Sequence, residues 1–163
     1  KREKIEKRFL PRFSQVAFIV QMPHLVPLAE FEKLEGKKFE ENDVIELEER
    51  MKYAKIWLSE FAPSEYRFEL TEEISEPAKN LSDTQKEYLN KAIEIYNQDE
   101  TPESLQISLY ELTKEMGIPT KDAFSAIYLS LIGKNHGPKA AWLILSLDRV
   151  FVQKRFSQVL KNF

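Results

Sequence analysis

A short stretch near the end of the chain, GKNHGP at residues 133–138, is the most informative one for chemistry. Lys134 and the following Lys139 carry ammonium groups, while Asn135 and His136 offer hydrogen-bond donors and acceptors. The stretch precedes an apolar segment that we expect to be helical. The free amides and dipole of a helix N-terminus favour an anion or the edge of a base. We therefore predict a site for a phosphate or a base, and the alternative is a turn that only connects two helices.

The glycines and proline of this stretch, and a tryptophan that follows it, are expected to be structural. Gly133 follows an apolar segment of helical period, and Gly137 precedes Pro138, so we interpret them as punctuation between helices. Trp142 shares a helical face with apolar neighbours, which favours a place in the core. The four glycines of the sequence do not form the clustered pattern that phosphate-binding loops need.

Positive charge gathers at the two ends of the chain. Residues 1–12 hold six basic and two acidic groups, and residues 134–163 hold six basic and one acidic group. In contrast, residues 30–103 hold ten basic and twenty-one acidic groups. The C-terminal basic block is a candidate footprint for phosphates, and the alternative is a solvated face with positive charge at helix C-termini. The block comprises Lys134, Lys139, Arg149, Lys154, Arg155 and Lys161.

Two arginines deserve separate interpretations. Arg67 lies between Tyr66 and Phe68 in an expected connection, where it is a candidate for stacking on a base or for contacting a phosphate. Arg149 is a candidate for the same kind of contact, and an ion-pairing or helix-packing role is the favoured alternative for it.

Composition excludes several classes of site. The chain of 163 residues has no cysteine and only two histidines, His24 and His136, which excludes a thiol nucleophile or disulfide framework and nearly excludes a structural zinc site. His24 lies between prolines with no nucleophile nearby and is interpreted as a loop histidine. Carboxylates occur in runs such as Glu40-Glu41, where we expect exposure rather than the contrasting environments that acid–base catalysis needs. We expect no metal, cofactor or catalytic residue in this chain.

The N-terminal region carries no targeting signal. Neither a signal peptide nor an apolar run of about 18 residues is present, so we expect a cytoplasmic protein without a membrane anchor. The first residue is Lys1 rather than Met, which leads us to expect a piece of a longer chain.

Apolar residues recur at helical spacing along most of the chain, which predicts an all-α fold. Expected capping boxes are Asp43 with Glu46 and Ser82 with Gln85, and only Tyr66–Leu70 alternates as a strand would. We place helices over residues 13–20, 28–34, 43–61, 82–96, 101–116, 124–131, 138–145 and 151–159. The expected architecture is an irregular helical bundle or helix cage of about seven to nine helices.

The distribution of prolines and acids predicts two helical halves. Pro63, Pro77 and many carboxylates fall between them. We place the first helical subdomain at residues 1–62, a connecting segment at 63–81 and a C-terminal helical subdomain at 82–163.

The sequence from Phe124 to Val152 resembles the C-terminal signature of class I lysyl-tRNA synthetases. In that family, F-x-x-I-Y-x-x-L-x-G-K-x-x-G-P-[RK]-A is followed by a helix rich in Trp or Leu and then by S-L-D-R-x-F-V. This chain carries the pattern, with Ala141 where glycine is expected. Shorter similarities, such as PRF at 11–13 and YRF at 66–68, extend the resemblance over about residues 11–156.

The resemblance implies an anticodon-binding region with a helix cage similar to that of glutamyl-tRNA synthetases. Its expected partners are the anticodon stem-loop of tRNA(Lys) and the catalytic domain of the same parent chain. The HIGH and KMSKS motifs of class I catalytic domains are absent here, so ATP, Mg²⁺ and lysine activation are expected of that domain. An alternative from another class is a helical protein-interaction module without RNA binding. The candidate tRNA contacts are Lys134, Asn135, His136, Lys139, Arg67 and Arg149.

Overall fold

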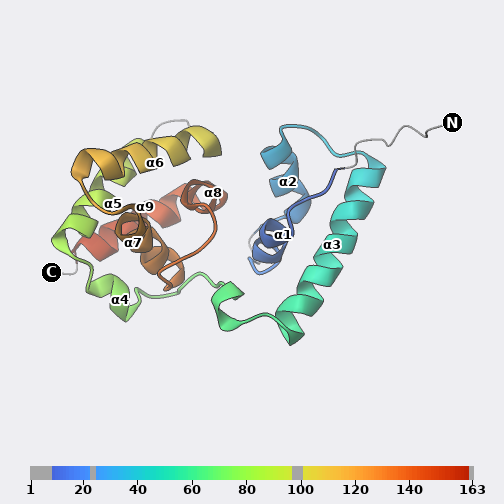
Figure 1. Cartoon of the computed structure of the whole chain (residues 1–163), viewed down its shortest axis with the longest axis horizontal. Coiled ribbons are helices and arrows are strands. Elements are labelled where there is room, and N and C mark those ends of the chain that lie inside the picture. The colour runs from blue at the N-terminus through green and yellow to red at the C-terminus, as the bar shows by residue number, and fades with distance from the viewer. Residues whose placement is uncertain (1–8, 23–24, 97–100, 162–163) are drawn as a thin grey trace. The chain divides into compact units, whose positions relative to one another are not determined.

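The computed structural model describes residues 9–22, 25–96 and 101–161, and the chain divides into two compact units (Figure 1). Unit 1 is Lys1–Glu69 and unit 2 is Leu70–Phe163. The division after Glu69 falls inside the predicted connecting segment, and the later residues of that segment belong to unit 2.

The described residues contain nine α-helices, one short 3-10 helix and no strand, which confirms the predicted all-α fold. None of these helices is both long enough and apolar enough to cross a membrane.

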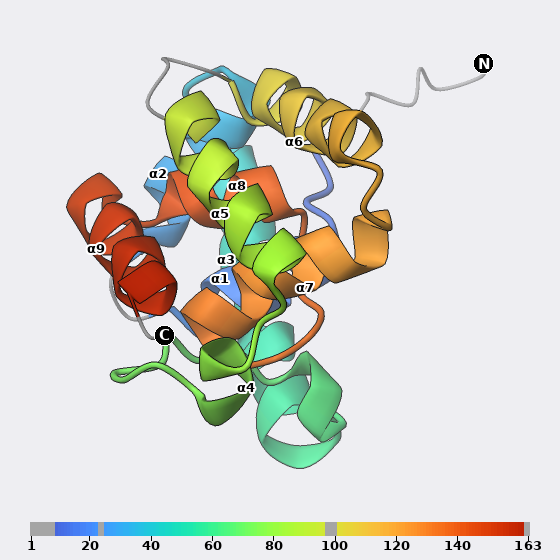
Figure 2. The ribbon, with the colours of Figure 1, turned by 90° about the vertical axis from the view of Figure 1, so that its left-hand side faces the viewer.

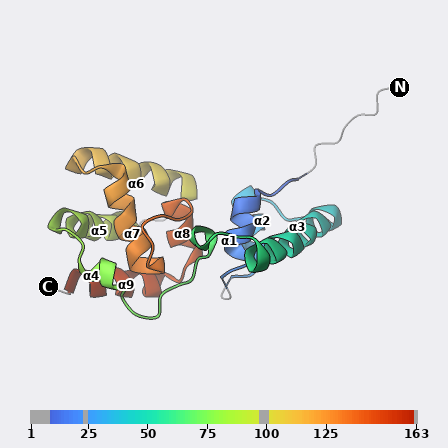
Figure 3. The same cartoon turned by 60° about the horizontal axis from the view of Figure 1, so that its bottom comes forward.

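Unit 1 is built on one long helix. Its elements are α1 (Phe13–Ile19), α2 (Pro27–Glu35), α3 (Glu41–Glu60) and the 3-10 helix η1 (Ser64–Tyr66). Helix α1 packs against α3, and Figure 3 shows the two helices next to each other. The buried apolar side chains of this unit include Val16, Phe18, Ile19, Met22, Phe31, Leu47 and Ala54.

The start of α3 corrects one predicted cap. The helix begins at Glu41 with Glu40 as its N-cap, so Asp43 occupies the third helical position instead of the cap. The Asp43 carboxylate accepts hydrogen bonds from the Glu40 N–H (3.3 Å) and from Lys37 (3.2 Å). The predicted pair of Asp43 with Glu46 is therefore wrong, because Asp43 reaches back toward the N-terminus.

The segment Tyr66–Leu70 is not a strand. The Gln21 side chain accepts from the Phe68 N–H (2.8 Å) and donates to the Tyr66 carbonyl (3.0 Å). A single side chain thus satisfies the backbone groups that a neighbouring strand would otherwise pair with.

Unit 2 is a helical bundle. Its helices are α4 (Glu76–Lys79), α5 (Asp83–Tyr96), α6 (Pro102–Met116), α7 (Thr120–Ile132), α8 (Ala140–Ser146) and α9 (Arg149–Lys161). Helix α5 contacts α6, α7 and α9, and Figure 2 looks onto it. The core includes Tyr88, Leu89, Leu105, Leu109, Ile127, Leu131, Leu143 and Phe156.

Helix ends in unit 2 follow from local chemistry. Ser82 and Gln85 exchange backbone-to-side-chain hydrogen bonds of 3.0 and 3.2 Å, which confirms the predicted box at α5. Gly117 ends α6 with a left-handed φ of +65°, a conformation that costs glycine little. Helix α8 begins at Ala140, two residues later than Pro138, and the one-turn helix α4 is absent from the predictions.

Candidate nucleic-acid interface

The loop at residues 133–139, which contains the predicted stretch 133–138, joins α7 to α8 and is anchored at its first residue. Gly133 caps α7 with a left-handed φ of +67°. A Cβ at this position would lie 3.0 Å from Cγ2 of Thr71 and 3.6 Å from Cβ of Ser75. Glycine is therefore needed twice, for the backbone turn and for the close approach of segment 71–75.

The Tyr128 side chain of α7 packs against the second half of the loop. A Cβ on Gly137 would lie 2.8 and 2.9 Å from two carbons of the Tyr128 ring. The Tyr128 hydroxyl donates a hydrogen bond to the Pro138 carbonyl. Burial raises the pKa of Tyr128 to about 12, so this hydroxyl stays protonated, and remains a donor, at neutral pH.

The polar tip of the loop faces solvent. Asn135, His136 and Lys139 are exposed, and Lys134 is half-buried. Asn135 Oδ1 and His136 Nδ1 lie 3.0 Å apart, which holds the two neighbouring side chains together. An amide, an imidazole and an ammonium group are thus displayed on one short, braced loop, which suits a ligand with both base edges and phosphates.

The N-terminus of α8 is less open than the sequence predicts. The Ala141 N–H donates to Gln106 Oε1 of α6 at 3.0 Å, so one expected free amide is already satisfied. Helix α8 has only seven residues. One of the amides on which the predicted anion site relies is therefore occupied, and the polar side chains of the loop are the remaining candidates for ligand contacts.

A buried arginine holds the end of α7 in place. The Arg155 side chain of α9 is only 3% exposed. Its guanidinium donates to the carbonyls of Ser130 (3.1 Å), Thr71 (2.6 Å) and Glu72 (3.0 Å), and also to the Thr71 hydroxyl. Because the C-terminal end of a helix carries partial negative charge, the end of α7 also stabilises this cation.

Segment 71–75 completes the cap of α7. The Thr71 N–H donates to the Leu131 carbonyl at 3.1 Å, and the Ser75 hydroxyl donates to the Leu129 carbonyl at 3.1 Å. The last-turn carbonyls, which a helix leaves unpaired, thus find partners in this segment and in Arg155. The loop at 133–139 consequently starts from a fixed point.

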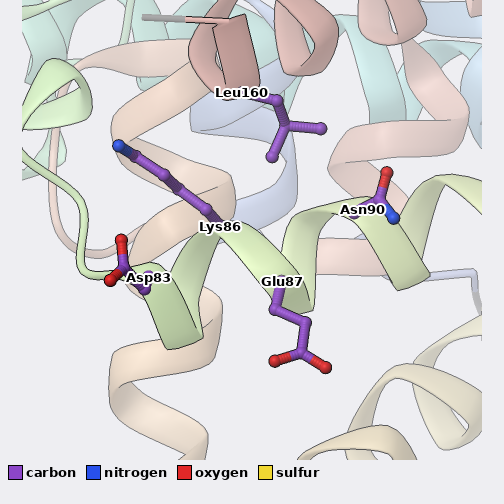
Figure 4. A pocket seen from close by; sticks show the side chains of 5 residues that line it. All are labelled: Asp83, Lys86, Glu87, Asn90 and Leu160. Carbon is purple, nitrogen blue, oxygen red and sulfur yellow. The ribbon is translucent and has the colours of Figure 1, made fainter. Parts of the chain in front are cut away.

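A surface pocket lies elsewhere on unit 2. It is lined by Asp83, Lys86, Glu87, Asn90 and Leu160 of α5 and α9 (Figure 4). Two acidic residues and one lysine are among its lining residues, which does not favour phosphate. The described part of the chain also holds no group of three or more His, Asp or Glu side chains placed to bind a metal ion.

Comparison with known proteins decides the family. A family model described as "Anticodon binding domain" matches residues 15–160. The chain belongs to the anticodon-binding domain family. The anticodon-binding domain is also 34% identical, over 115 residues, to the lysine–tRNA ligase of Archaeoglobus fulgidus, covering 71% of this chain and 23% of that protein.

Two further lysine–tRNA ligases cover more of the anticodon-binding domain. The protein of Methanosphaera stadtmanae is 33% identical over 130 residues, which are 77% of this chain and 24% of that protein. The protein of Pyrococcus horikoshii is 32% identical over 150 residues, which are 88% of this chain and 28% of that protein. These relatives confirm the predicted kinship with lysine–tRNA ligases, and the chain spans about a quarter of their length.

The predicted contact residues of the anticodon-binding domain fall in both units. Lys134, Asn135, His136 and Lys139 share the loop of unit 2, whereas Arg67 is exposed in unit 1 directly after η1. Phe68, which flanks Arg67, is buried, so only Tyr66 of that pair is available for stacking. Trp142 is buried, and His24 lies outside the described residues.

The basic block at the C-terminal end is not a single footprint. Arg155 is buried and turned to backbone carbonyls, so it cannot contact a phosphate. Arg149 has its guanidinium 5.6 Å from the centre of the Tyr96 ring, and it donates to the Tyr96 carbonyl at 3.5 Å. These contacts are of the packing kind that the sequence favoured for Arg149. Lys139 and Lys154 are exposed.

Sequence reasoning missed the residues that brace the loop. Tyr128 reads as one more apolar position of α7, and Arg155 reads as one more surface cation. The spacing of these residues within amphipathic helices is the signal that could have placed them on the buried faces. Arg155, for example, is next to Phe156 and three residues after Val152, and both of these are buried.

Proposed function

We propose that this domain binds the anticodon stem-loop of tRNA(Lys) and holds it for the catalytic domain of a class I lysine–tRNA ligase. The observation that carries the proposal is the family match over residues 15–160 together with relatives that are lysine–tRNA ligases. The exposed loop at 133–139, with its amide, imidazole and ammonium groups, supplies chemistry suited to an RNA loop.

An anticodon loop exposes the parts of a nucleotide that duplex RNA hides. Its unpaired bases can be splayed outward and read along their pairing edges. A uridine offers two carbonyl acceptors and one imino donor, which the Asn135 amide and the His136 ring can match. The exposed Lys139 and the half-buried Lys134 contact the phosphates that flank the base, because an ammonium group binds phosphate without reading sequence.

The chemistry of aminoacylation belongs to the rest of the parent chain in this proposal. The catalytic domain supplies the sites for ATP, Mg²⁺ and lysine, and this domain contributes selection and orientation of the tRNA. We expect it to act in the cytoplasm as part of that ligase.

Removing one lysine tests the phosphate contacts. Lys139→Ala is expected to weaken binding of all tRNAs alike and to reduce the slope of log affinity against log salt by about 0.7–0.9, since one fewer phosphate is neutralised. Filter binding over a salt series measures the slope. Lys121→Ala, at an exposed lysine of α7 away from the loop, is the matched control and should leave the slope unchanged. Equal slopes for both variants would remove Lys139 from the interface.

Removing the amide or the imidazole tests base reading. Asn135→Ala or His136→Ala is expected to reduce discrimination between tRNA(Lys) and an anticodon-swapped tRNA by about 1–3 kcal/mol, with the salt slope unchanged. Asn90→Ala, at an exposed asparagine of α5, is the control. Unaltered discrimination in both loop variants would show that the loop is a connection and that the base is read elsewhere.

A further inference from the structure

Unit 1 carries a cluster of three aromatic side chains at its surface, outside its buried core. The rings of Phe13 and Trp57 are 5.6 Å apart between centroids, and those of Trp57 and Tyr66 are 5.5 Å apart, both edge to face. Phe13 is 37% exposed, Tyr66 is 49% exposed, and Trp57 is half-buried. We call these three residues the Trp57 platform. Part of each side chain is accessible to solvent, and the three together form a contiguous aromatic patch, which can mark an interaction site.

The Trp57 platform is held rigidly by the backbone beneath it. Trp57 belongs to the 20-residue helix α3, and Phe13 is the first residue of α1. The Gln21 side chain fixes the segment that bears Tyr66, because its amide nitrogen bonds to the carbonyls of Ala17 (2.9 Å) and Tyr66 (3.0 Å). A preorganised aromatic surface loses little entropy when a ligand stacks on it.

Two arginines stand next to the Trp57 platform in sequence. Arg12 precedes Phe13 and Arg67 follows Tyr66, and both are exposed. Within the part of the chain that the structure describes, neither guanidinium has an ion pair or a hydrogen bond. By contrast, Lys37 and Lys38 of the same unit are paired with carboxylates at 3.2 and 2.7 Å. Arg12 and Arg67 are thus cations that the described carboxylates leave unpaired, as are Lys33, Arg50, Lys52 and Lys55 of the same unit.

We propose that the Trp57 platform is a second RNA contact, on which one unpaired base of the bound RNA stacks while Arg12 and Arg67 contact the adjoining phosphates. Bases stack on aromatic side chains whatever their identity, and arginines serve the backbone next to them. Because residues 30–69 of unit 1 hold twelve acidic and seven basic groups, the platform disfavours a long strand. It suits one or two nucleotides. The identity of the RNA as tRNA(Lys) rests on the proposed function, whereas the stacking chemistry does not.

Fluorine NMR on the 163-residue chain labelled with 5-fluorotryptophan tests this contact. The chain has two tryptophans, and Trp57→Phe assigns their signals. Addition of tRNA(Lys) or of a uridine hexanucleotide is expected to shift the Trp57 signal. Arg67→Gln is expected to lower the salt slope of hexanucleotide binding by about 0.7.

Tyrosine variants make the test specific. Tyr66→Ala is expected to weaken hexanucleotide binding about tenfold, within the range measured for loss of one stacked base. Tyr66→Phe keeps the ring and should bind as the unchanged chain does. The control is Tyr53→Ala, since Tyr53 is a 55% exposed tyrosine of α3 outside the cluster.

The outcomes separate this inference from the proposed function. If tRNA(Lys) binds but the Trp57 signal does not move, and Tyr66→Ala behaves as Tyr53→Ala does, the platform is not an RNA contact although the proposed function holds. If the hexanucleotide shifts Trp57 while tRNA(Lys) does not bind, the stacking site stands and the proposed function fails. Binding of neither overturns both.

Discussion

Arg155→Met is expected to lower the free energy of unfolding of unit 2 by about 3–4 kcal/mol, because hydrogen bonds from a charged donor are worth about 1.5–3 kcal/mol each and their buried acceptors are left unpaired. Four oxygens on three residues, Thr71, Glu72 and Ser130, depend on this one guanidinium. Methionine fills much of the same volume, so the loss reflects the hydrogen bonds more than a cavity. Urea unfolding followed by circular dichroism measures it.

The neighbouring residue of α9 gives the control for Arg155. Lys154 is exposed, and Lys154→Met is expected to change stability by less than about 0.5 kcal/mol. Hydrogen exchange localises the effect: the Thr71 amide, which donates to the Leu131 carbonyl, should lose protection in Arg155→Met. If Arg155→Met and Lys154→Met unfold at the same urea concentration, the role assigned to Arg155 is wrong.

Gly137→Ala is expected to cost about 1–3 kcal/mol of stability, which is typical of overpacking a well-packed site. The added methyl group would lie 2.8 Å from Cδ1 of Tyr128 and 3.1 Å from Cδ1 of Ile132, so either the ring or the loop must move. Displacing the ring also disturbs the hydrogen bond from Tyr128 to the Pro138 carbonyl. Since the loop bears the proposed base-reading side chains, tRNA affinity should fall about tenfold, the equivalent of one lost contact to a base.

A second glycine separates loop displacement from general destabilisation. Gly117 ends α6 with a φ of +65° and has no atom within 4 Å of an added Cβ. Gly117→Ala should therefore cost about 1 kcal/mol through backbone strain alone and leave tRNA affinity unchanged. If the two alanine variants lose stability and affinity alike, the loop is not braced by Tyr128 in the way described.

The helices were predictable where local signals suffice. Helix α3 appears from its apolar spacing, and α5 from the reciprocal box of Ser82 with Gln85. Errors arose where a distant side chain decides the backbone. Gln21 takes the place of a strand partner for Tyr66–Leu70, and its role depends on a contact 45 residues away in the chain.

The sequence predicts which polar side chains the loop exposes, but it does not predict the contacts that hold the loop in place. The composition of the loop at 133–139 identifies the polar groups that reach solvent. Two other features depend on packing between helices that are far apart in sequence. Gln106 accepts a hydrogen bond from an amide of α8, and Arg155 points into the core. Charge counting alone treats Arg155 and Lys154 alike, although one is buried and the other is exposed.

Binding of the 163-residue chain to tRNA(Lys) and to the same tRNA with a swapped anticodon, each over a salt series, tests the central claim most directly. We predict at least about tenfold tighter binding of tRNA(Lys) at every salt concentration, since base contacts set the difference, with parallel slopes because both tRNAs share the phosphate contacts. Equal affinity for the two tRNAs, or no measurable binding of either, would contradict the account.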